Sequence, residues 1–416
     1  MNTANESSVW GTLTGIRPAK KIEKAIESGM SKTEATNMLI KDYQVSPKRA
    51  KLSADIAEKT LSLKGSLDPH AISLYISIPF CPTRCAYCSF ISNSVEKALK
   101  LIEPYIELLQ NEITQTAQLV NELGLKVISV YIGGGTPTVL SANQLEIIMQ
   151  QLNTAFDLSN LPEYTVEAGR PDTITIEKLN IMKQQGANRV CINPQSMSED
   201  VLKAIGRKHT PEDIIASVKP AGDLGLILNM DIIAGLPGDT PKGFKNTLDT
   251  VIALNPENIT IHTLSLKKGT KIMLEDTPRP IAKDVEEMLD YASDTLTNHN
   301  YIPYYLYRQK YTSGNFENTG WSKAGFEGLY NKLMMDEIGT VFAMGAGAVT
   351  KLVLPDDRIE RIFNMKYPRE YILNSDRISG KIETIIKYYT PLRSEALIHS
   401  LTGCKMEDNL CHTHII

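Results

Sequence analysis

The sequence predicts an α/β protein: a partial (β/α)6 barrel of the TIM type, with a small N-terminal helical unit and a C-terminal α+β extension. Three observations support this fold class. Residues 1–68 show helical spacing of apolar positions, residues 69–275 alternate six β-rich runs with helical runs, and residues 276–390 mix both kinds of run. A repeated order of strand then helix indicates a parallel sheet covered by helices. Residues 391–416 form a tail with little pattern.

The N-terminal region contains three expected helices, at 19–29, 31–43 and 47–62. Two of them have clear start signals. Ser31 and Glu34 have the spacing of a capping box, and Ser46 places a capping residue directly before a proline. The sequence leaves open whether this unit is a lid, a docking element or simple packing.

The barrel region is defined by six expected strands and the helices between them. The strands are 73–79, 127–133, 164–169, 189–195, 227–235 and 258–264, and the helices after the second strand are 143–156, 175–185, 198–206, 211–224 and 241–254. In βα barrels the chemistry lies at the carboxyl ends of the strands. The motifs discussed below fall at such positions.

The C-terminal extension is expected to hold a helix at 280–299, a strand at 301–307 and a helix-then-strand run that reaches 344–350. The tail beyond it carries four residues with metal-ligand chemistry: Cys404, Cys411, His412 and His414. Their spacing suits a soft metal, but a mobile terminus is the commoner outcome for such a segment.

Composition excludes several classes of protein. Net charge is −4 and no basic stripe runs along the chain, so no nucleic-acid partner is expected. No apolar run approaches the ~20 residues that a transmembrane helix needs. Three of the six cysteines fall within eight residues, which favours metal ligation in a reducing compartment over a disulfide scaffold. We therefore expect a cytoplasmic protein.

Cys81, Cys85 and Cys88 follow the first expected strand with the spacing C-x3-C-x2-C. Such a loop can give one thiolate to each of three irons of a cuboidal cluster. The fourth iron then keeps an open position for a small molecule. The alternative is a structural zinc site, which needs four ligands. For a zinc site, the candidate for the fourth ligand would be His70, the nearest histidine before the three cysteines.

The run CPTRCAYC resembles the signature of the radical S-adenosylmethionine (radical SAM) enzymes. This resemblance implies a [4Fe–4S] cluster on the three cysteines, whose open iron chelates the amino and carboxylate groups of S-adenosylmethionine. An electron from the cluster then cleaves the cofactor into methionine and a 5′-deoxyadenosyl radical. Tyr87 is implied to lie against the adenine; packing beneath the loop is the alternative.

A glycine run and four polar residues are further cofactor candidates. Glycines allow close approach of the backbone and can expose its N–H groups to a ligand. The run containing Gly134, Gly135 and Thr136 resembles the motif that meets the methionine end in this superfamily. The other four candidates are Glu167 for the ammonium, Arg207 for the carboxylate, and Gln195 and Asp231 for the ribose hydroxyls.

Further motifs indicate which group of radical SAM enzymes the chain resembles. LYISIPFC, GGGTPT, TVEAGRPDT, PQS, DIIAGLPGDT and MGAGAV occur in the order found in the oxygen-independent coproporphyrinogen III oxidase group, while TLTGIRPAK and GNFENTGW resemble its coproporphyrinogen dehydrogenase branch. Tyr75 becomes a cofactor candidate through the first motif. Members of the group bind a second S-adenosylmethionine, and the positions that align with that region are Gly135, Thr136, Ser265 and Val349.

The resemblance implies oxidative decarboxylation of two propionates of coproporphyrinogen III to give protoporphyrinogen IX, with an electron donor such as flavodoxin or ferredoxin. Arg170 and Arg308 are candidate cations for the propionates, unless they form surface ion pairs. Phe90 stands where established oxidases have a fourth cysteine, a feature that resembles the heme-chaperone branch. The alternatives are therefore a heme-binding chaperone and a radical enzyme with another substrate.

Overall fold

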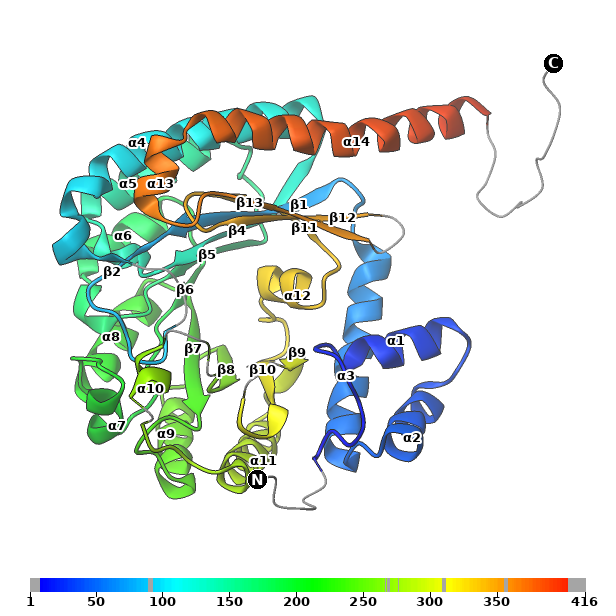
Figure 1. The fold of residues 1–416 in the computed structure, drawn as a ribbon, viewed down its shortest axis with the longest axis vertical. Coiled ribbons are helices and arrows are strands. Elements are labelled where there is room, and N and C mark those ends of the chain that lie inside the picture. Colours follow the sequence, from blue (N-terminus) through cyan, green and yellow to red (C-terminus); the bar gives the residue numbers. More distant parts are fainter. Residues whose placement is uncertain are drawn as a thin grey trace.

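The computed structural model describes residues 8–88, 93–265, 267, 270–275, 277–308, 312–354 and 358–402 (Figure 1). Phe90 and the four cysteine and histidine residues of the tail lie outside the described residues. In the described part of the chain, no helix is long and apolar enough to cross a membrane.

The core is an open sheet of eleven strands, in the order β13-β12-β11-β1-β4-β5-β6-β7-β8-β10-β9. The strands β1, β4, β5, β6, β7 and β8 are the six expected from the sequence, and each pairs in parallel with the next. They span Ala71–Ile78, Lys126–Gly134, Glu163–Glu167, Arg189–Cys191, Ile227–Ala234 and Asn258–Thr263. The expectation of a partial barrel with parallel strands is confirmed, since no hydrogen bonds join β13 to β9 in the described sheet.

The C-terminal extension adds strands to both edges of this sheet. β9 (Ile302–Arg308) and β10 (Glu317–Ser322) continue it antiparallel beyond β8. β11 (Thr340–Met344) pairs in parallel with β1, and β12 (Val349–Val353) and β13 (Ile359–Phe363) follow it antiparallel. A separate pair, β2 (Phe80–Cys81) and β3 (Asn93–Ser94), lies at the cysteine loop.

The strand expected to reach 344–350 divides into two, which corrects the sequence-based boundary. A turn separates β11 from β12, with Gly345 at φ +93° and Gly347 at φ +71°. A Cβ on Gly345 would lie 2.4 Å from the Tyr105 hydroxyl and 2.7 Å from the Ser77 carbonyl oxygen. The glycine therefore lets this turn pack directly on β1 and on the helix after it.

The α-helices of the described residues follow one another along the chain. They are α1 (Ala19–Glu27), α2 (Lys32–Tyr43), α3 (Pro47–Ser66), α4 (Val95–Glu122), α5 (Ala142–Ala155), α6 (Ile176–Gln184), α7 (Glu199–Ala204), α8 (Pro211–Asp223), α9 (Pro241–Ala253), α10 (Lys271–Leu274), α11 (Ala282–Asn298), α12 (Leu329–Met335), α13 (Pro368–Leu373) and α14 (Asp376–Thr402). Both groups of the predicted capping box at Ser31 and Glu34 are in place. α14 continues past residue 391, where the sequence shows little periodicity.

Helix α12 lies inside the opening of the curved sheet, whereas α4 to α9 cover its outer side (Figure 1). Glu163 of β5 accepts hydrogen bonds from the backbone N–H groups of Leu329 (2.6 Å) and Tyr330 (3.3 Å) at the start of α12. The Tyr330 ring stacks on Tyr131 of β4 with centroids 4.5 Å apart. A short helix of the extension thus becomes an inner wall of the barrel.

The N-terminal helices pack on the extension. Trp10 Nε1 and Arg49 Nε both contact the Glu317 carboxylate, each at 2.8 Å. Arg17 Nε donates to the Met335 carbonyl oxygen at the end of α12 (2.5 Å). This packing connects the opening motif of the chain to the helix that lines the barrel.

Candidate active site

A pocket with a volume of about 370 Å³ lies at the carboxyl ends of the parallel strands. Its wall is built from the cysteine loop after β1, from the ends of β4 to β8, and from β9, β10 and α12. Sequence-predicted candidates on this wall are Cys81, Cys85, Tyr87, Cys88, Gly134, Gly135, Thr136, Glu167, Arg170, Gln195, Arg207, Asp231 and Ser265. Tyr75, Val349 and Arg308 are not among its lining residues.

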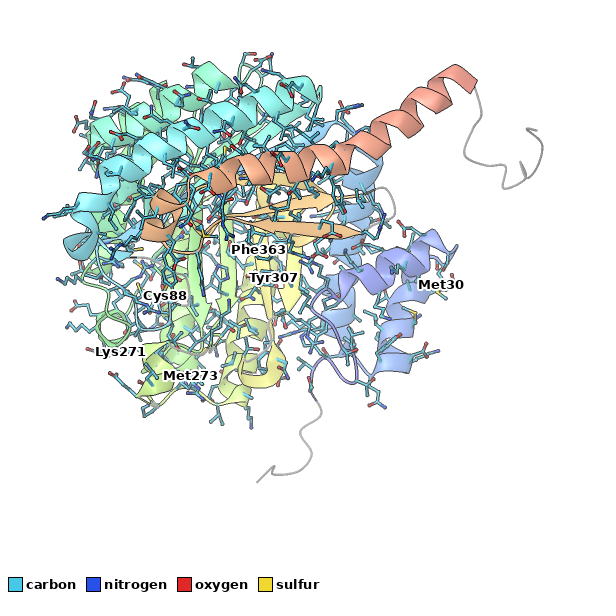
Figure 2. The ribbon with its side chains drawn as sticks, turned by 45° about the horizontal axis from the view of Figure 1, so that its top comes forward. Met30, Cys88, Lys271, Met273, Tyr307 and Phe363 are labelled. Carbon is cyan, nitrogen blue, oxygen red and sulfur yellow. The ribbon has the colours of Figure 1, made fainter. Side chains whose placement is uncertain are left out.

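The three cysteines are unbridged thiols on the loop that follows β1. Ala86 N–H donates to the Ile205 carbonyl oxygen (2.9 Å), and the Ala86 carbonyl oxygen accepts from Ile272 N–H of α10 (3.3 Å). Figure 2 shows the same proximity, with Cys88 near Lys271 and Met273 of α10. The loop is therefore held from both sides while its thiols line the pocket.

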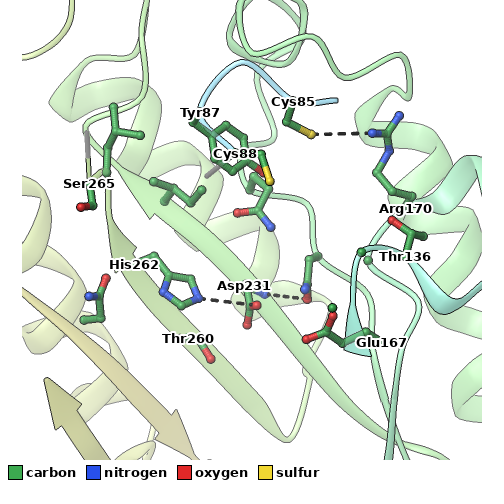
Figure 3. A pocket seen from close by; sticks show the side chains of 18 of the residues that line it. Cys85, Tyr87, Cys88, Thr136, Glu167, Arg170, Asp231, Thr260, His262 and Ser265 are labelled. Carbon is green, nitrogen blue, oxygen red and sulfur yellow. Dashed lines mark hydrogen bonds and ion pairs between the residues drawn. The ribbon is translucent and has the colours of Figure 1, made fainter. Parts of the chain in front are cut away.

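Two polar side chains direct hydrogens at the sulfur atoms. Thr136 Oγ1 lies 3.5 Å from Cys81 Sγ. Arg170 Nη1 lies 3.7 Å from Cys85 Sγ, a contact that Figure 3 shows as a dashed line. Donors of this kind can also hydrogen-bond the cysteine sulfurs of a bound iron–sulfur cluster. Three thiols at one pocket end with donors beside them fit a cluster bound through three irons. In the described residues, no group of three His, Cys, Asp or Glu side chains is arranged to hold one metal ion between them, whereas a cluster takes each thiolate on a different iron.

The glycine run lets the β4 end approach the cysteine loop. A Cβ on Gly135 would lie 2.4 Å from the Phe80 carbonyl oxygen. Gly135 N–H donates to the Ile78 carbonyl oxygen and Thr136 N–H to that of Phe80, both at 2.8 Å. The N–H groups of Gly135 and Thr136 thus already have protein acceptors at the end of β1 and in β2.

Glu167 ends β5 and faces Tyr131, a residue that the sequence did not single out. Its Oε1 accepts a hydrogen bond from the Tyr131 hydroxyl (2.6 Å). Burial raises the pKa of Glu167 to about 7, although hydrogen bonds from Tyr131 and the Gly134 N–H oppose the shift. Tyr75 stacks on Tyr131 with centroids 6.2 Å apart, so it supports the pocket wall from behind.

Asp231 on β7 stays ionised. Burial acts to raise its pKa, but hydrogen bonds from His262, Asn229 and Thr260 outweigh burial and the pKa is lowered. Asn229 Nδ2 lies 2.9 Å from Asp231 Oδ1, and His262 Nε2 lies 3.6 Å from Oδ2 (Figure 3). Asn229 lies on β7 with Asp231, whereas His262 and Thr260 lie on the neighbouring strand β8. The sequence pattern of β7 alone therefore could not identify His262 as a partner of Asp231.

The Arg207 guanidinium makes hydrogen bonds within the protein that the sequence did not indicate. Its Nη1 donates to the carbonyl oxygens of Gly169 (2.9 Å) and Asn193 (2.7 Å), and its Nη2 to the Tyr87 hydroxyl (3.2 Å). A fork pairing with a ligand carboxylate would compete with these bonds. The guanidinium instead joins the cysteine loop to the ends of β5 and β6.

Gln195 has a left-handed backbone, with φ +67°. Its N–H donates to the Asp231 carbonyl oxygen (2.9 Å), and its own carbonyl oxygen accepts from Ile233 N–H (3.0 Å). A non-glycine residue in this region costs about 1–2 kcal/mol. The flanking β7 backbone holds the strained residue, which places its side chain on the pocket wall.

The two arginines expected to meet the propionates both have protein partners, and only Arg170 lies on the pocket wall. Arg170 is buried and pairs with Asp172 (3.1 Å) while Nη2 donates to Thr83 Oγ1 (3.1 Å). Arg308 Nη1 donates to the Leu13 carbonyl oxygen (2.7 Å), and its guanidinium lies over the Trp10 ring. Side chains alternate along a strand, so Tyr307 of β9 faces the pocket and Arg308 does not.

Known proteins support the same assignment. The model of the Radical SAM superfamily matches residues 75–251. The chain is 38% identical over 386 residues, 91% of its length and 76% of the relative, to the oxygen-independent coproporphyrinogen-III oxidase-like protein HemZ of Bacillus subtilis. It is 31% identical over 282 residues to the heme chaperone HemW of the same organism, covering 66% of this chain and 70% of the relative.

A solved structure has the same fold. The coproporphyrinogen III oxidase HemN of Escherichia coli, described as a radical SAM enzyme, matches with a TM-score of 0.61 at 22% identity, over 77% of this chain and 72% of that one. The family match, the long alignment with HemZ and the pocket at the cysteine loop agree. The chain belongs to the radical SAM superfamily and, within it, to the oxygen-independent coproporphyrinogen III oxidase-like group.

Proposed function

We propose that this protein decarboxylates coproporphyrinogen III oxidatively, without oxygen, to protoporphyrinogen IX. The observation that carries the proposal is a single pocket in which three thiols occupy one end and polar and aromatic side chains of β8, β9 and β10 form the other. The HemZ relative, which aligns with 91% of the chain, supports the same reaction class. The radical source and the substrate would then share one cavity.

Cys81, Cys85 and Cys88 would hold a [4Fe–4S] cluster, with S-adenosylmethionine bound at its open iron. When bound, this pair supplies a 5′-deoxyadenosyl radical that can remove a hydrogen atom from a propionate β-carbon. Loss of CO2 and of one electron to an external acceptor leaves the vinyl group, and 5′-deoxyadenosine carries the hydrogen. Two such rounds convert both propionates.

The protein's own residues would bind and orient the cofactor. Thr136 and Arg170 would donate hydrogen bonds to the sulfurs of two of the cluster ligands, Cys81 and Cys85. Glu167 and Asp231 give carboxylate oxygens at the pocket wall, for the ammonium and the ribose hydroxyls respectively. Burial raises the pKa of Glu167 to about 7, so a hydrogen bond donated by the amino group of the cofactor would favour its charged form.

A heme-binding chaperone is the second candidate. It is favoured by Phe90 in place of a fourth cysteine and by the 31% identity to HemW of Bacillus subtilis. Such a protein would use the same cluster loop and would bind heme without releasing CO2.

The deciding experiment uses anaerobically reconstituted protein with reductant, S-adenosylmethionine and coproporphyrinogen III. We expect protoporphyrinogen IX and CO2 together with 5′-deoxyadenosine. Formation of 5′-deoxyadenosine with neither product would refute the decarboxylase. Stoichiometric binding of heme, when heme is added under the same conditions, would support the chaperone. The Cys85→Ala variant is the control: it should lose the cluster absorbance near 400 nm and all cofactor cleavage.

A further inference from the structure

Asn318 of β10 is a buried amide on the pocket wall, on the side away from the cysteine loop. Asn318 as a whole is 1% exposed. Oδ1 accepts a hydrogen bond from Thr263 N–H of β8 (2.7 Å). Among the described residues, Nδ2 has no hydrogen-bond partner. The residue therefore lines the pocket with a donor that the protein leaves unused.

The orientation of this amide is determined by its neighbour. A backbone N–H can only donate, so the atom facing Thr263 must be the amide oxygen, and the NH2 group must face the other way. Thr263 is itself held, because its Oγ1 donates to the Glu317 carbonyl oxygen (2.7 Å). Leaving a buried donor unpaired costs about 1–3 kcal/mol. An acceptor supplied by a ligand would recover that cost.

The hydrogen-bond donors on the pocket wall differ in whether the protein already uses them. Arg170 and Arg207 lie beside the cysteine loop, and most of their donors already have protein acceptors. On the wall formed by β8, β9 and β10, His262 lies against the Asp231 carboxylate, whereas Asn318 Nδ2 has no partner among the described residues. An acceptor group of a ligand is therefore well placed at Asn318.

We propose that Asn318 Nδ2 donates a hydrogen bond to a carboxylate of the substrate and so positions it in the pocket. This inference rests on the proposed function, since a porphyrinogen carries its carboxylates on propionate arms. It also replaces Arg170 and Arg308 in that role, because both guanidinium groups have protein partners. Asn318 would touch the substrate directly, through one neutral donor.

The test measures binding without turnover. Cluster-loaded protein is titrated anaerobically, without reductant, with coproporphyrin III and with its tetramethyl ester in one detergent buffer. Asn318→Asp keeps the oxygen that accepts from Thr263 N–H and turns the donor into an anion. Asn318→Leu removes the donor without adding charge. Asn246→Leu, on the exposed face of α9, is the matched control.

We expect Asn318→Leu to weaken binding of the free acid by about 10- to 100-fold in Kd, the range for a hydrogen bond to a charged group. Asn318→Asp should weaken it further, with a much smaller effect on the ester, because the introduced carboxylate repels only an ionised partner. The Kd for S-adenosylmethionine and the melting temperature should stay close to wild type in the Leu variant.

Three results would overturn the inference: wild-type affinity of both variants for the free acid, equal weakening of acid and ester by Asn318→Asp, or a loss of S-adenosylmethionine affinity that matches the porphyrin loss. Each leaves the proposed function standing, because the wild type still binds the porphyrin. If the wild type itself fails to bind coproporphyrin III, the inference falls, and the proposed function falls with it when coproporphyrinogen III also yields no protoporphyrinogen IX.

Discussion

Replacing Glu167 with glutamine should stabilise the ligand-free protein, and only at neutral and alkaline pH. Burial raises the pKa of Glu167 from 4.5 to about 7. At 1.36 kcal/mol per pKa unit, holding this carboxylate ionised in the fold costs about 3 kcal/mol. The sign follows from the direction of the shift: the folded state prefers the protonated acid, so stability is lost as pH rises from about 4.5 through 7.

The assay is urea unfolding of wild type and Glu167→Gln at pH 5 and pH 8, without S-adenosylmethionine. Near pH 5 the two proteins should differ little, because both carry a neutral group. At pH 8 the variant should be more stable by up to about 3 kcal/mol. Glu199→Gln, on the exposed surface of α7, is the control and should show no such pH dependence.

The same substitution should reduce stabilisation by the cofactor. A ligand that binds the folded state raises its stability by mass action. S-adenosylmethionine should therefore raise the melting temperature of the wild type more than that of Glu167→Gln, because the glutamine oxygen still accepts a hydrogen bond from the amino group but carries no negative charge. A stability difference that is equal at both pH values would refute the burial argument, and unchanged cofactor binding would refute the role of Glu167.

Three further substitutions test the packing that builds the site. Gly135→Ala should reduce iron bound per chain after reconstitution, because its Cβ would lie 2.4 Å from a carbonyl oxygen of the cysteine loop, whereas Gly65→Ala, with open space around it, should bind iron normally. Lys381→Met should lower the free energy of unfolding by roughly 3–5 kcal/mol, since it leaves Glu112, 0% exposed, without its cation. Arg17→Ala should cost roughly 1–3 kcal/mol in urea unfolding through loss of its hydrogen bond to the end of α12.

Each of these has a result that contradicts it. Full iron loading of Gly135→Ala would show that the two loops can separate without losing the cluster. Wild-type stability of Lys381→Met would mean that Glu112 protonates at little cost, and an unchanged unfolding curve for Arg17→Ala would mean that the N-terminal helices do not stabilise α12.

The parts of the site that depend on neighbouring residues could be predicted from the sequence. The cysteine loop and the glycine run each depend on contiguous residues, and their spacing is set by the ligands and the turns that they form. The order of the six parallel strands followed from alternating β-rich and helical runs, because parallel strands require a crossover between them. Glu167, Gln195 and Asp231 reached the pocket because strand ends in such a sheet share one edge.

Partners that come from distant elements needed the tertiary structure. Tyr131, His262 and Asn318 face the pocket only because three different strands meet there, and no short sequence pattern marks them. Arg308 was assigned by its charge, but the pleat of β9 turns it to the opposite face. A charged side chain takes whichever partner the fold brings within reach, and residue type alone does not show which partner that is.

The sequence by itself therefore determined the strand order and the loop that can carry a cluster, because both are encoded by neighbouring residues. Only the tertiary structure decided which polar groups remain unpaired at the pocket. Arg170 and Arg207 were both expected to meet ligand carboxylates, but the fold engages most of their donors. Asn318 keeps its donor unused, because the strands around it satisfy its oxygen and no acceptor in the described part of the chain meets its nitrogen.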